Sequence, residues 1–330
     1  GRLVLEKAPL FVLSVISSVV TYMVQRPSIV KLERLPLGVR LSNAVISYLG
    51  YISKMILPVD LAVLYPYPKE FPIWHVVSSL VILLLLTFGI VYLGRQRRYI
   101  LIGWLWYLVM LVPVIGIVQV GPQAMADRYP YLPSIGFFII VSWGAAELVS
   151  GRYRTFLLGI FGTVTVFVLV MCTRVQVRYW RDEVTLYKHT VEVTSGNHVA
   201  HSNLAIALVS RGRFEDAIGQ YRQMLLLKPD NPETLSGLGA ALAMKGDFDR
   251  AVEYLTYAIK LDPNNCGAHN NLGNTLIAKG RFDAALAHYL QALRLHPDYV
   301  SSLSGAAIVL SEHPDESRRD ILESFRFAAK

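Results

Sequence analysis

The sequence predicts an all-α protein in which a polytopic bundle of transmembrane helices precedes an α-solenoid of helix–turn–helix repeats. Two observations carry this prediction. Residues 1–181 contain several long, nearly uncharged apolar runs, whereas the last third of the chain repeats the same residue types every 34 positions. With 53% hydrophobic residues and a mean hydropathy of +0.41, the chain is also too apolar for a soluble protein of its length.

The 34-residue period is typical of the tetratricopeptide repeat, in which helix pairs stack into a solenoid. Three residue types keep the period: Gly212, Gly246 and Gly280; Ala217, Ala251 and Ala285; Pro229, Pro263 and Pro297. Counting back from the prolines predicts three repeats at 198–231, 232–265 and 266–299. We expect residues 182–197 to form a half-repeat that docks the solenoid on the last span, and residues 300–330 to form a partial repeat or capping helix.

Two positions of the repeat are expected to build its interior. Position eight is small in every repeat, where the two helices cross closely, and position 24 is aromatic or leucine. The residues are Ala205, Gly239 and Gly273 at position eight, and Tyr221, Leu255 and Tyr289 at position 24. We expect the larger side chains to fill the space between neighbouring repeats.

Residues 1–181 are predicted to cross the membrane five or six times. A helix needs about 20 apolar residues to cross a hydrocarbon core of about 30 Å. The runs that approach or exceed this length are 9–25, 72–94, 99–120, 134–150 and 155–173. The stretch 43–61 is interrupted by Asn43, Ser47 and Lys54, and suits either a sixth span or an amphipathic helix at the outer surface.

Two tight basic turns predict the orientation of these spans. Residues 95–98 read Arg-Gln-Arg-Arg, and residues 151–154 read Gly-Arg-Tyr-Arg. Lys and Arg gather in cytoplasmic loops, so both turns are expected inside the cell. The loop 121–133 and the repeats would then lie on the opposite, extracytoplasmic side.

The charge of the chain belongs to its membrane half. Residues 1–181 carry 17 Lys/Arg against 6 Asp/Glu, whereas residues 182–330 carry 15 against 18. The repeats therefore present no basic face, and we expect no nucleic-acid partner. Two cysteines form no disulfide framework, and His198 and His201 have no third ligand nearby, so no metal site is predicted.

The predicted outer loop contains an Asp-Arg pair flanked by tyrosines and prolines. Arg128 can bind a lipid phosphate in bidentate fashion, with Asp127, Tyr129 and Tyr131 as its neighbours in the site. Alternatively, the loop is an interfacial anchor in which Asp127 and Arg128 pair to cap the next helix.

The run from Asp127 to Phe137 reads DRYPYLPSIGF. It resembles the motif of the transmembrane-and-tetratricopeptide-repeat-containing proteins, which are O-mannosyltransferases of the glycosyltransferase C superfamily with many bacterial relatives. The order of parts is similar as well: spans, this loop, two more spans and then repeats. Residues 5–11 and 54–68 also resemble the bacterial relatives, so the resemblance covers nearly the whole chain.

This resemblance implies a membrane glycosyltransferase that moves a sugar, mannose in the named family, from a polyprenyl-phosphate donor to a protein hydroxyl. In that superfamily the catalytic acidic residues lie in the first outer loop, and no paired carboxylates follow an early span here. We therefore expect an N-terminally truncated fragment whose catalytic residues lie upstream. No cofactor is evident, and a divalent metal is neither implied nor excluded. The resemblance favours a bacterial inner membrane, with the lipid bilayer as one partner and the repeats in the periplasm.

The repeats are expected to hold a polypeptide in the groove formed by their first helices. The polar candidates in this groove are Ser202, Asn203, Ser236, Asn270, Asn271 and Asn274. Asparagine amides bond an extended backbone without reading its side chains, which suits a module that presents acceptors. The alternatives are that these side chains only cap or solvate the groove, and that the whole chain is a non-catalytic membrane scaffold for protein–protein interaction.

Overall fold

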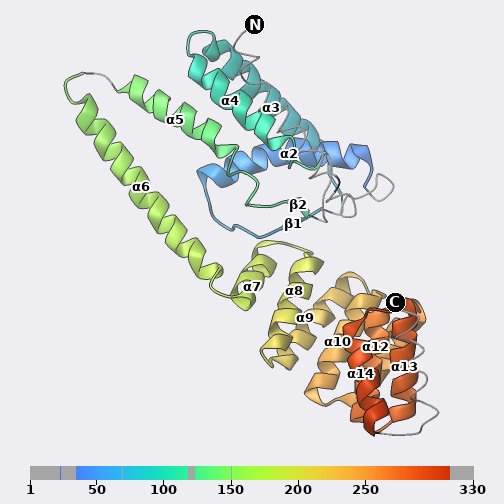
Figure 1. The fold of residues 1–330 in the computed structure, drawn as a ribbon. Coiled ribbons are helices and arrows are strands. Elements are labelled where there is room, and N and C mark those ends of the chain that lie inside the picture. Colours follow the sequence, from blue (N-terminus) through green and yellow to red (C-terminus); the bar gives the residue numbers. More distant parts are fainter. Residues whose placement is uncertain (1–22, 24–34, 69, 118–122, 150, 313–330) are drawn as a thin grey trace. The chain divides into compact units, whose positions relative to one another are not determined.

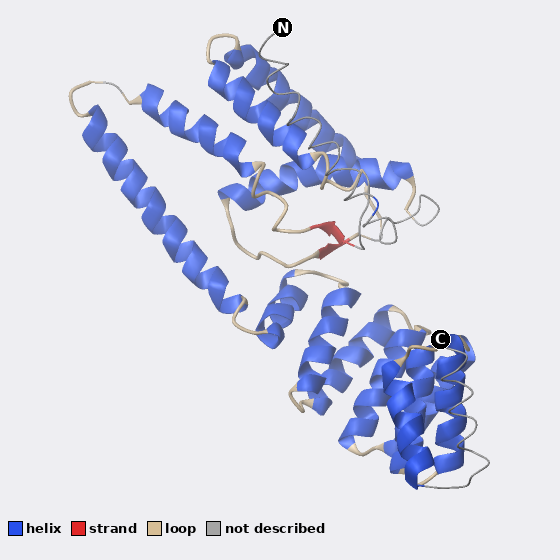
Figure 2. Cartoon of the chain, viewed as in Figure 1, coloured by secondary structure: helices blue, strands red, loops and turns tan. Residues whose placement is uncertain are grey.

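The computed structural model describes residue 23 and residues 35–68, 70–117, 123–149 and 151–312. The chain divides into two compact units, which are described separately. The first comprises residues 1–181 with 192–195, and the second comprises residues 182–191 with 196–330. Figures 1 and 2 show that helices dominate both units, as the sequence predicts.

The described part of the first unit contains helices and one small sheet. The helices are α2 (Leu37–Ile56), α3 (Ile73–Gly94), α4 (Arg98–Leu111), α5 (Ser134–Leu148) and α6 (Arg154–Tyr179). The strands β1 (Tyr65–Pro66) and β2 (Gln123–Met125) pair antiparallel, which the sequence analysis did not predict. The sheet lies close to α2 in Figure 1, and it ties the segment after α2 to the predicted outer loop.

Two of the described helices are long and apolar enough to cross a membrane, judged by length and composition alone. They are α3, with 22 residues, and α6, with 26 residues. The predicted span 99–120 is helical only to Leu111, because Pro113 has no N–H to continue the hydrogen-bond series. At about 1.5 Å per residue, the 14-residue α4 and the 15-residue α5 are each shorter than a bilayer core. The predicted run 9–25 lies outside the described residues except Met23.

Helices α4 and α5 cross at two glycines that face each other. A β-carbon at Gly103 would stand 2.4 Å from the carbonyl oxygen of Gly136, and one at Gly136 would stand 2.2 Å from that of Gly103. Any larger residue would separate the helices. Close crossing at small residues is a common packing mode between apolar helices, and this contact brings the end of the loop, at Ser134, to the side of α4.

The second unit is a row of antiparallel helix pairs. After α7 (Glu183–Val193) come α8 (His198–Ser210), α9 (Phe214–Leu227), α10 (Pro232–Lys245), α11 (Phe248–Leu261), α12 (Cys266–Ala278), α13 (Phe282–Leu295) and α14 (Val300–Glu312). Each pair is joined at a glycine with positive φ, at Gly212, Gly246 and Gly280. Only glycine adopts this left-handed backbone without strain, which explains why the glycines keep the 34-residue period.

The first helix of each pair begins behind an asparagine that recurs with the same period. The side-chain oxygens of Asn197, Asn231 and Asn265 accept hydrogen bonds from the backbone N–H three residues later, at 3.1, 2.8 and 2.9 Å. Such N-caps satisfy a backbone donor that the first turn leaves free. The sequence analysis did not single out these asparagines, although their spacing was visible.

The interior of the solenoid follows the two positions that the sequence analysis picked out. A β-carbon at Gly239 would stand 2.6 Å from Leu255, and one at Gly273 would stand 2.7 Å from the ring of Tyr289. The side chains of Leu255 and Tyr289 are fully buried. Small residues at position eight therefore make room for position 24, as predicted.

Ion pairs link successive repeats on the surface. Lys245 pairs with Glu215, and Lys279 pairs with Asp249, so that both pairs use the same two positions of the repeat. Arg211 pairs with Asp182 at 3.4 Å and extends the series towards α7. These side chains are mostly exposed, and each such pair stabilises a surface by little, about 0–1 kcal/mol.

Candidate functional site

The loop that carries Asp127 is held by a clasp of hydrogen bonds. The carboxylate of Asp127 accepts bonds from the backbone N–H of Ala62, at 2.6 Å, and from the hydroxyl of Tyr65, at 3.0 Å. Burial raises the pKa of Asp127, while these two donors act in the opposite direction. Burial and the neighbouring Asp127 charge raise the pKa of Tyr65, so its hydroxyl stays protonated and donates.

One face of α2 supports the same loop with polar side chains. The amide of Asn43 donates to the carbonyl oxygen of Ala124 at 3.0 Å, and the backbone N–H of Ala126 donates to the hydroxyl of Tyr51 at 3.2 Å. Arg40 donates to the carbonyl oxygens of Leu35 and Ile117, at 2.9 and 3.3 Å. Buried polar groups of this kind fix the loop backbone because each must keep its partner.

This support explains the ambiguous stretch 43–61. Arg40, Asn43, Ser47 and Tyr51 recur at helical spacing on α2, and all four are buried. Of the polar residues that interrupt the apolar run, Asn43 binds the loop, Ser47 is buried on the same face, and Lys54 donates to the carbonyl oxygens of Val59 and Asp60. The spacing of three and four between the buried residues was the signal in the sequence, but it did not reveal which segment they would contact.

Of the remaining loop candidates, Arg128 and Tyr131 lie at the surface, whereas Tyr129 is partly buried. Arg128 is exposed, and its guanidinium carbon stands 5.4 Å from the centre of the Tyr129 ring. The Tyr129 hydroxyl accepts a bond from the amide of Gln123 at 2.9 Å. Tyr131 is 75% exposed. Asp127 and Arg128 do not form the helix cap of the alternative interpretation, because Asp127 binds Ala62 and Tyr65 and the residue at the N-cap of α5 is Pro133.

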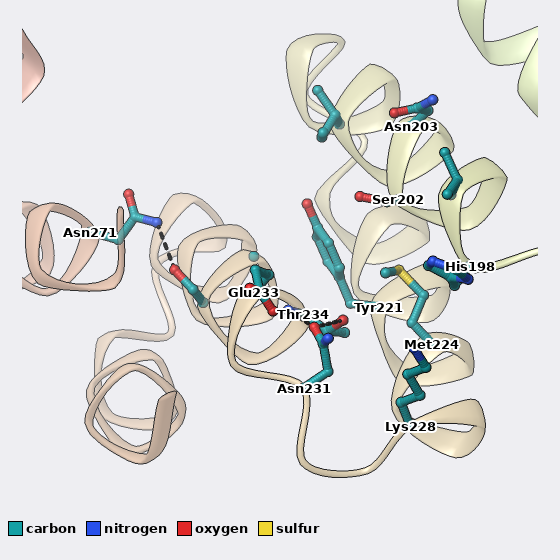
Figure 3. Close-up of a pocket in the computed structure, with 14 residues that line it drawn as sticks. His198, Ser202, Asn203, Tyr221, Met224, Lys228, Asn231, Glu233, Thr234 and Asn271 are labelled. Atoms are coloured by element: carbon teal, nitrogen blue, oxygen red, sulfur yellow. Dashed lines mark hydrogen bonds between the residues drawn. The ribbon is translucent and has the colours of Figure 1, made fainter. Parts of the chain in front are cut away.

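The repeat groove contains a pocket between the first and second repeats. Its volume is about 620 Å³, and α8, the end of α9 and the start of α10 line it. Figure 3 shows the ring of Tyr221 standing between α8, which carries Ser202 and Asn203, and α10, which carries Glu233 and Thr234. The predicted groove residues Ser202, Asn203, Ser236 and Asn271 all line this pocket.

Two other predicted groove residues bind neighbours within the solenoid. Asn270 is 5% exposed, and its side-chain oxygen accepts a bond from the hydroxyl of Ser302 at 3.0 Å. Because α14 covers it, Asn270 is not available to a ligand, and its assignment to the groove is wrong. Asn274 is exposed, and its oxygen accepts a bond from the Tyr289 hydroxyl at 2.6 Å.

Several pocket residues were absent from the sequence-based candidates. Tyr221, Met224 and Lys228 come from α9 and its C-terminal end, whereas the sequence analysis considered only first helices as groove lining. Glu233 and Gly237 come from α10. Comparison of equivalent positions between repeats was the signal that could have found Gly237, since the corresponding residue in the third repeat is Asn271.

The histidines do not gather into a metal site in the described part of the chain. The Nδ1 atom of His201 lies 2.8 Å from the side-chain oxygen of Gln220, and His198 lines the pocket instead. Burial, with a smaller effect of Lys228, lowers the pKa of His198. No group of three metal-ligating side chains occurs among the described residues.

The fold and groove of the second unit define a tetratricopeptide-repeat protein. Two models of this repeat family match the chain, one over residues 202–266 and the other over residues 242–307. Tetratricopeptide repeats are therefore present in this region, and repeats of this family commonly serve protein–protein interaction.

Among proteins of known function, the chain is similar to protein O-mannosyl-transferases over the repeat region. It is 32% identical over 108 residues to Tmtc2 of Drosophila melanogaster, which covers 32% of this chain and 11% of that protein. It is 25% identical over 136 residues to TMTC1 of Mus musculus, covering 41% of this chain and 14% of that protein. The matches thus span less than a sixth of either relative.

Among solved structures, the chain is similar to MamA. The similarity covers 43% of this chain and 81% of that protein, with 20% sequence identity and a TM-score of 0.36.

Proposed function

We propose that this chain is the C-terminal part of a membrane glycosyltransferase that transfers a sugar from a polyprenyl-phosphate donor to polypeptides held by its repeats. The observation that carries the proposal is the similarity to protein O-mannosyl-transferases. Mannose is the proposed sugar for the same reason. The loop Asp127–Phe137 and the order of the parts add support from the sequence.

The apolar helices of the first unit support its placement in a membrane. Helices α3 and α6 each contain an 18-residue apolar stretch, and none of either stretch is buried inside the structure. Lipid is the environment in which such surfaces are stable. In the proposed topology, α4 and α5 complete a polytopic bundle, and the basic turns at 95–98 and 151–154 face the cytoplasm. The repeats then lie in the periplasm of a bacterial inner membrane.

Arg128 is the proposed contact for the phosphate of the donor. Its guanidinium is exposed and rests over the ring of Tyr129, while the clasp of Asp127, Ala62 and Tyr65 fixes the backbone next to it. A planar guanidinium binds two phosphate oxygens at once. The exposed Tyr131 hydroxyl is a further donor. Asp127 acts as a positioning residue, because its carboxylate is already bound by two donors.

The pocket of the repeats supports the proposed role in holding an acceptor. Its polar residues, Ser202, Asn203 and Asn271, lie beside apolar ones, Ile206 and Met224. Mixed linings of this kind bind the backbone and side chains of a polypeptide together. The acceptor would be an extended segment, which needs no fold of its own in order to bind.

Replacement of Arg128 by alanine in the full-length protein tests the proposal. We expect protein glycosylation to fall at least tenfold, because the donor loses a bidentate phosphate contact. The matched control is Arg152→Ala, which removes the same charge from an exposed turn of the same unit. Membrane insertion is measured for both variants by carbonate extraction. Unchanged glycosylation in Arg128→Ala would remove Arg128 from the donor site.

A non-catalytic scaffold is the second candidate function. The observation that favours it is the clasp itself, since a loop tied down by Ala62 and Tyr65 also serves as an interfacial anchor. In that case the wild-type full-length protein and its Arg128→Ala variant would both lack transferase activity. Both would still bind partners through their repeats. Measurement of sugar transfer from a synthetic polyprenyl-phosphate donor by the wild-type protein separates the two functions.

A further inference from the structure

The pocket between the first two repeats lacks two hydrogen bonds that close the corresponding spaces later in the solenoid. Tyr289, at position 24 of the third repeat, donates to Asn274 at 2.6 Å. Tyr221 occupies position 24 of the first repeat, but the residue equivalent to Asn274 is Ile206. The hydroxyl of Tyr221 therefore has no amide partner at this position.

The second missing bond concerns Ser202. Between the second and third repeats, the amide of Asn271 donates to the hydroxyl of Ser236 at 3.2 Å. Between the first and second repeats, the equivalent residues are Gly237 and Ser202. Within residues 151–312, neither Ser202 nor Tyr221 has a hydrogen-bond partner for its hydroxyl group, and both line the pocket. The Tyr221 ring occupies part of the space that a larger residue at position 237 would need for its side chain.

Apolar side chains form much of the remaining wall. Ile206 is 58% exposed although it lies on the concave helix α8, and Met224 lies deeper, at 8% exposed. Figure 3 shows Met224 below Ser202, on the side of the pocket that His198 also borders. An exposed isoleucine and a buried methionine in the wall of one pocket offer apolar surface on which an aliphatic side chain can leave water.

The charges around the pocket balance. Lys228 contributes a positive charge and Glu233 a negative one, and neither forms an ion pair among the described residues. Burial and, to a smaller extent, Lys228 lower the pKa of His198, which favours its neutral form. A strongly acidic or strongly basic peptide would find one of these charges repulsive, so the balance favours an uncharged segment.

We propose that this pocket binds an extended, uncharged polypeptide segment, one aliphatic side chain of which packs on Ile206 and Met224. Tyr221, Ser202 and Asn203 bind the backbone on either side of that side chain. The inference rests on the proposed function, and it adds a chemical class to the acceptor: uncharged sequence with an aliphatic anchor. It also places the anchor in the first repeat junction, where Ile206 replaces the asparagine that binds the equivalent tyrosine in the third repeat.

Three fluorescein-labelled heptapeptides test the class of ligand. Each has a Ser/Thr host sequence, and the central residue is leucine, lysine or glutamate. Anisotropy titration with the whole chain in nanodiscs should show the leucine peptide binding at least tenfold more tightly than the other two, because only leucine gains from burial. Equal affinities, or a preference for glutamate or lysine, would overturn the aliphatic anchor while leaving a peptide-binding groove in place.

Ile206→Asn tests the location. This change gives the first repeat the asparagine of the third, so the Tyr221 hydroxyl gains an internal partner and the apolar wall is lost. We expect the leucine peptide to bind at least tenfold more weakly. The matched control is Ile308→Asn, at the same repeat position of α14 and 48% exposed, which should leave binding unchanged. Circular dichroism checks that both variants remain helical.

A further variant separates the hydroxyl from the packing. Tyr221→Phe keeps the ring against Gly237 and removes only the free donor, so we expect a two- to tenfold loss of affinity. If Ile206→Asn and Ile308→Asn weaken binding equally, the anchor does not lie at the first junction and the inference is wrong. If none of the three peptides binds the wild-type chain, the peptide-holding role in the proposed function fails as well.

Discussion

The ring of Tyr221 packs against the backbone of Gly237 in the next repeat, so closely that a β-carbon at Gly237 would stand 2.6 Å from a ring carbon. The same relationship recurs at the junction between the third repeat and α14, where a β-carbon at Gly305 would stand 2.5 Å from the ring of Tyr289. Between these junctions position 24 is Leu255, and the facing residue is Asn271 rather than glycine. Where position 24 is tyrosine, the facing residue of the next repeat is glycine. Where position 24 is the smaller leucine, the space admits the side-chain amide of Asn271.

Gly237→Ala should therefore destabilise the repeats. The new methyl group displaces the Tyr221 ring, and overpacking of this kind costs about 1–3 kcal/mol. Urea unfolding followed by circular dichroism measures the change. The control is Gly219→Ala, because Gly219 also lies in a helix and nothing stands within 4 Å of its β-carbon position. That control should be neutral or stabilising by up to about 1 kcal/mol, since alanine favours helix.

A double variant tests whether the tyrosine causes the effect. Tyr221→Leu with Gly237→Ala reproduces the smaller side chain of the middle junction and removes the clash. Its free energy of unfolding should exceed the sum expected from the two single variants by at least about 0.5 kcal/mol, as coupled neighbours do. Strict additivity would show that the ring and the glycine do not constrain each other.

The N-cap asparagines give a second prediction about stability. Replacing Asn265 by alanine leaves the backbone N–H of Ala268 without its side-chain acceptor, and caps of this kind contribute about 0.5–2 kcal/mol. Replacement by serine or aspartate should retain most of the stability because both residues cap well. Urea unfolding curves of the three variants make the comparison. A loss as large in Asn265→Asp as in Asn265→Ala would argue against capping.

The success of the sequence analysis differed between the two units for a physical reason. In the repeats, equivalent residues recur at fixed spacing, so Gly212, Gly246 and Gly280 revealed the period, and small residues at position eight such as Gly273 predicted the close packing. In the first unit, α2 contacts the loop through Asn43 and Ala124, which lie 81 residues apart. No local pattern specifies such a partner. Helix ends were also missed, because a continuous apolar run hides the effect of Pro113.

A pair of histidines in the third repeat should make its stability depend on pH. The Nδ1 atoms of His269 and His288 lie 3.0 Å apart, and the Nε2 atom of His269 lies 3.3 Å from the carbonyl oxygen of Pro263. When the Nε2 atom of His269 donates to Pro263, its Nδ1 atom carries no hydrogen. That Nδ1 atom then accepts a hydrogen bond from the protonated Nδ1 atom of His288, so both rings are neutral. Burial lowers the pKa of both histidines; the charge of His269 lowers the pKa of His288 further, whereas the bond to Pro263 acts in the opposite direction on the pKa of His269.

The direction of the pH effect follows from these lowered pKa values. Above the unfolded pKa of about 6.5, both states hold neutral histidine and no cost arises. As the pH falls below 6.5, the unfolded chain takes up protons more readily, so the folded state loses stability. We expect the melting temperature to be flat from pH 8 to pH 7 and to fall between pH 6.5 and pH 5. His269→Gln should reduce this fall, whereas the control His296→Gln, outside the pair, should leave it in place.

The clasp at Asp127 predicts that the charge of this carboxylate is dispensable while its hydrogen bonds are required. Burial raises the pKa of Asp127, which means that the folded state disfavours the ionised form. An asparagine can accept from the N–H of Ala62 through its oxygen and donate through its amide to Tyr65, whose hydroxyl then accepts. Asp127→Asn should therefore keep the loop ordered and retain most glycosylation in the full-length protein.

Asp127→Ala should leave the Ala62 donor unpaired and increase proteolytic cleavage between residues 121 and 133. It should also reduce glycosylation, because Arg128 is displaced. Loss of activity in Asp127→Asn with unchanged resistance to protease would instead assign the carboxylate a direct chemical role.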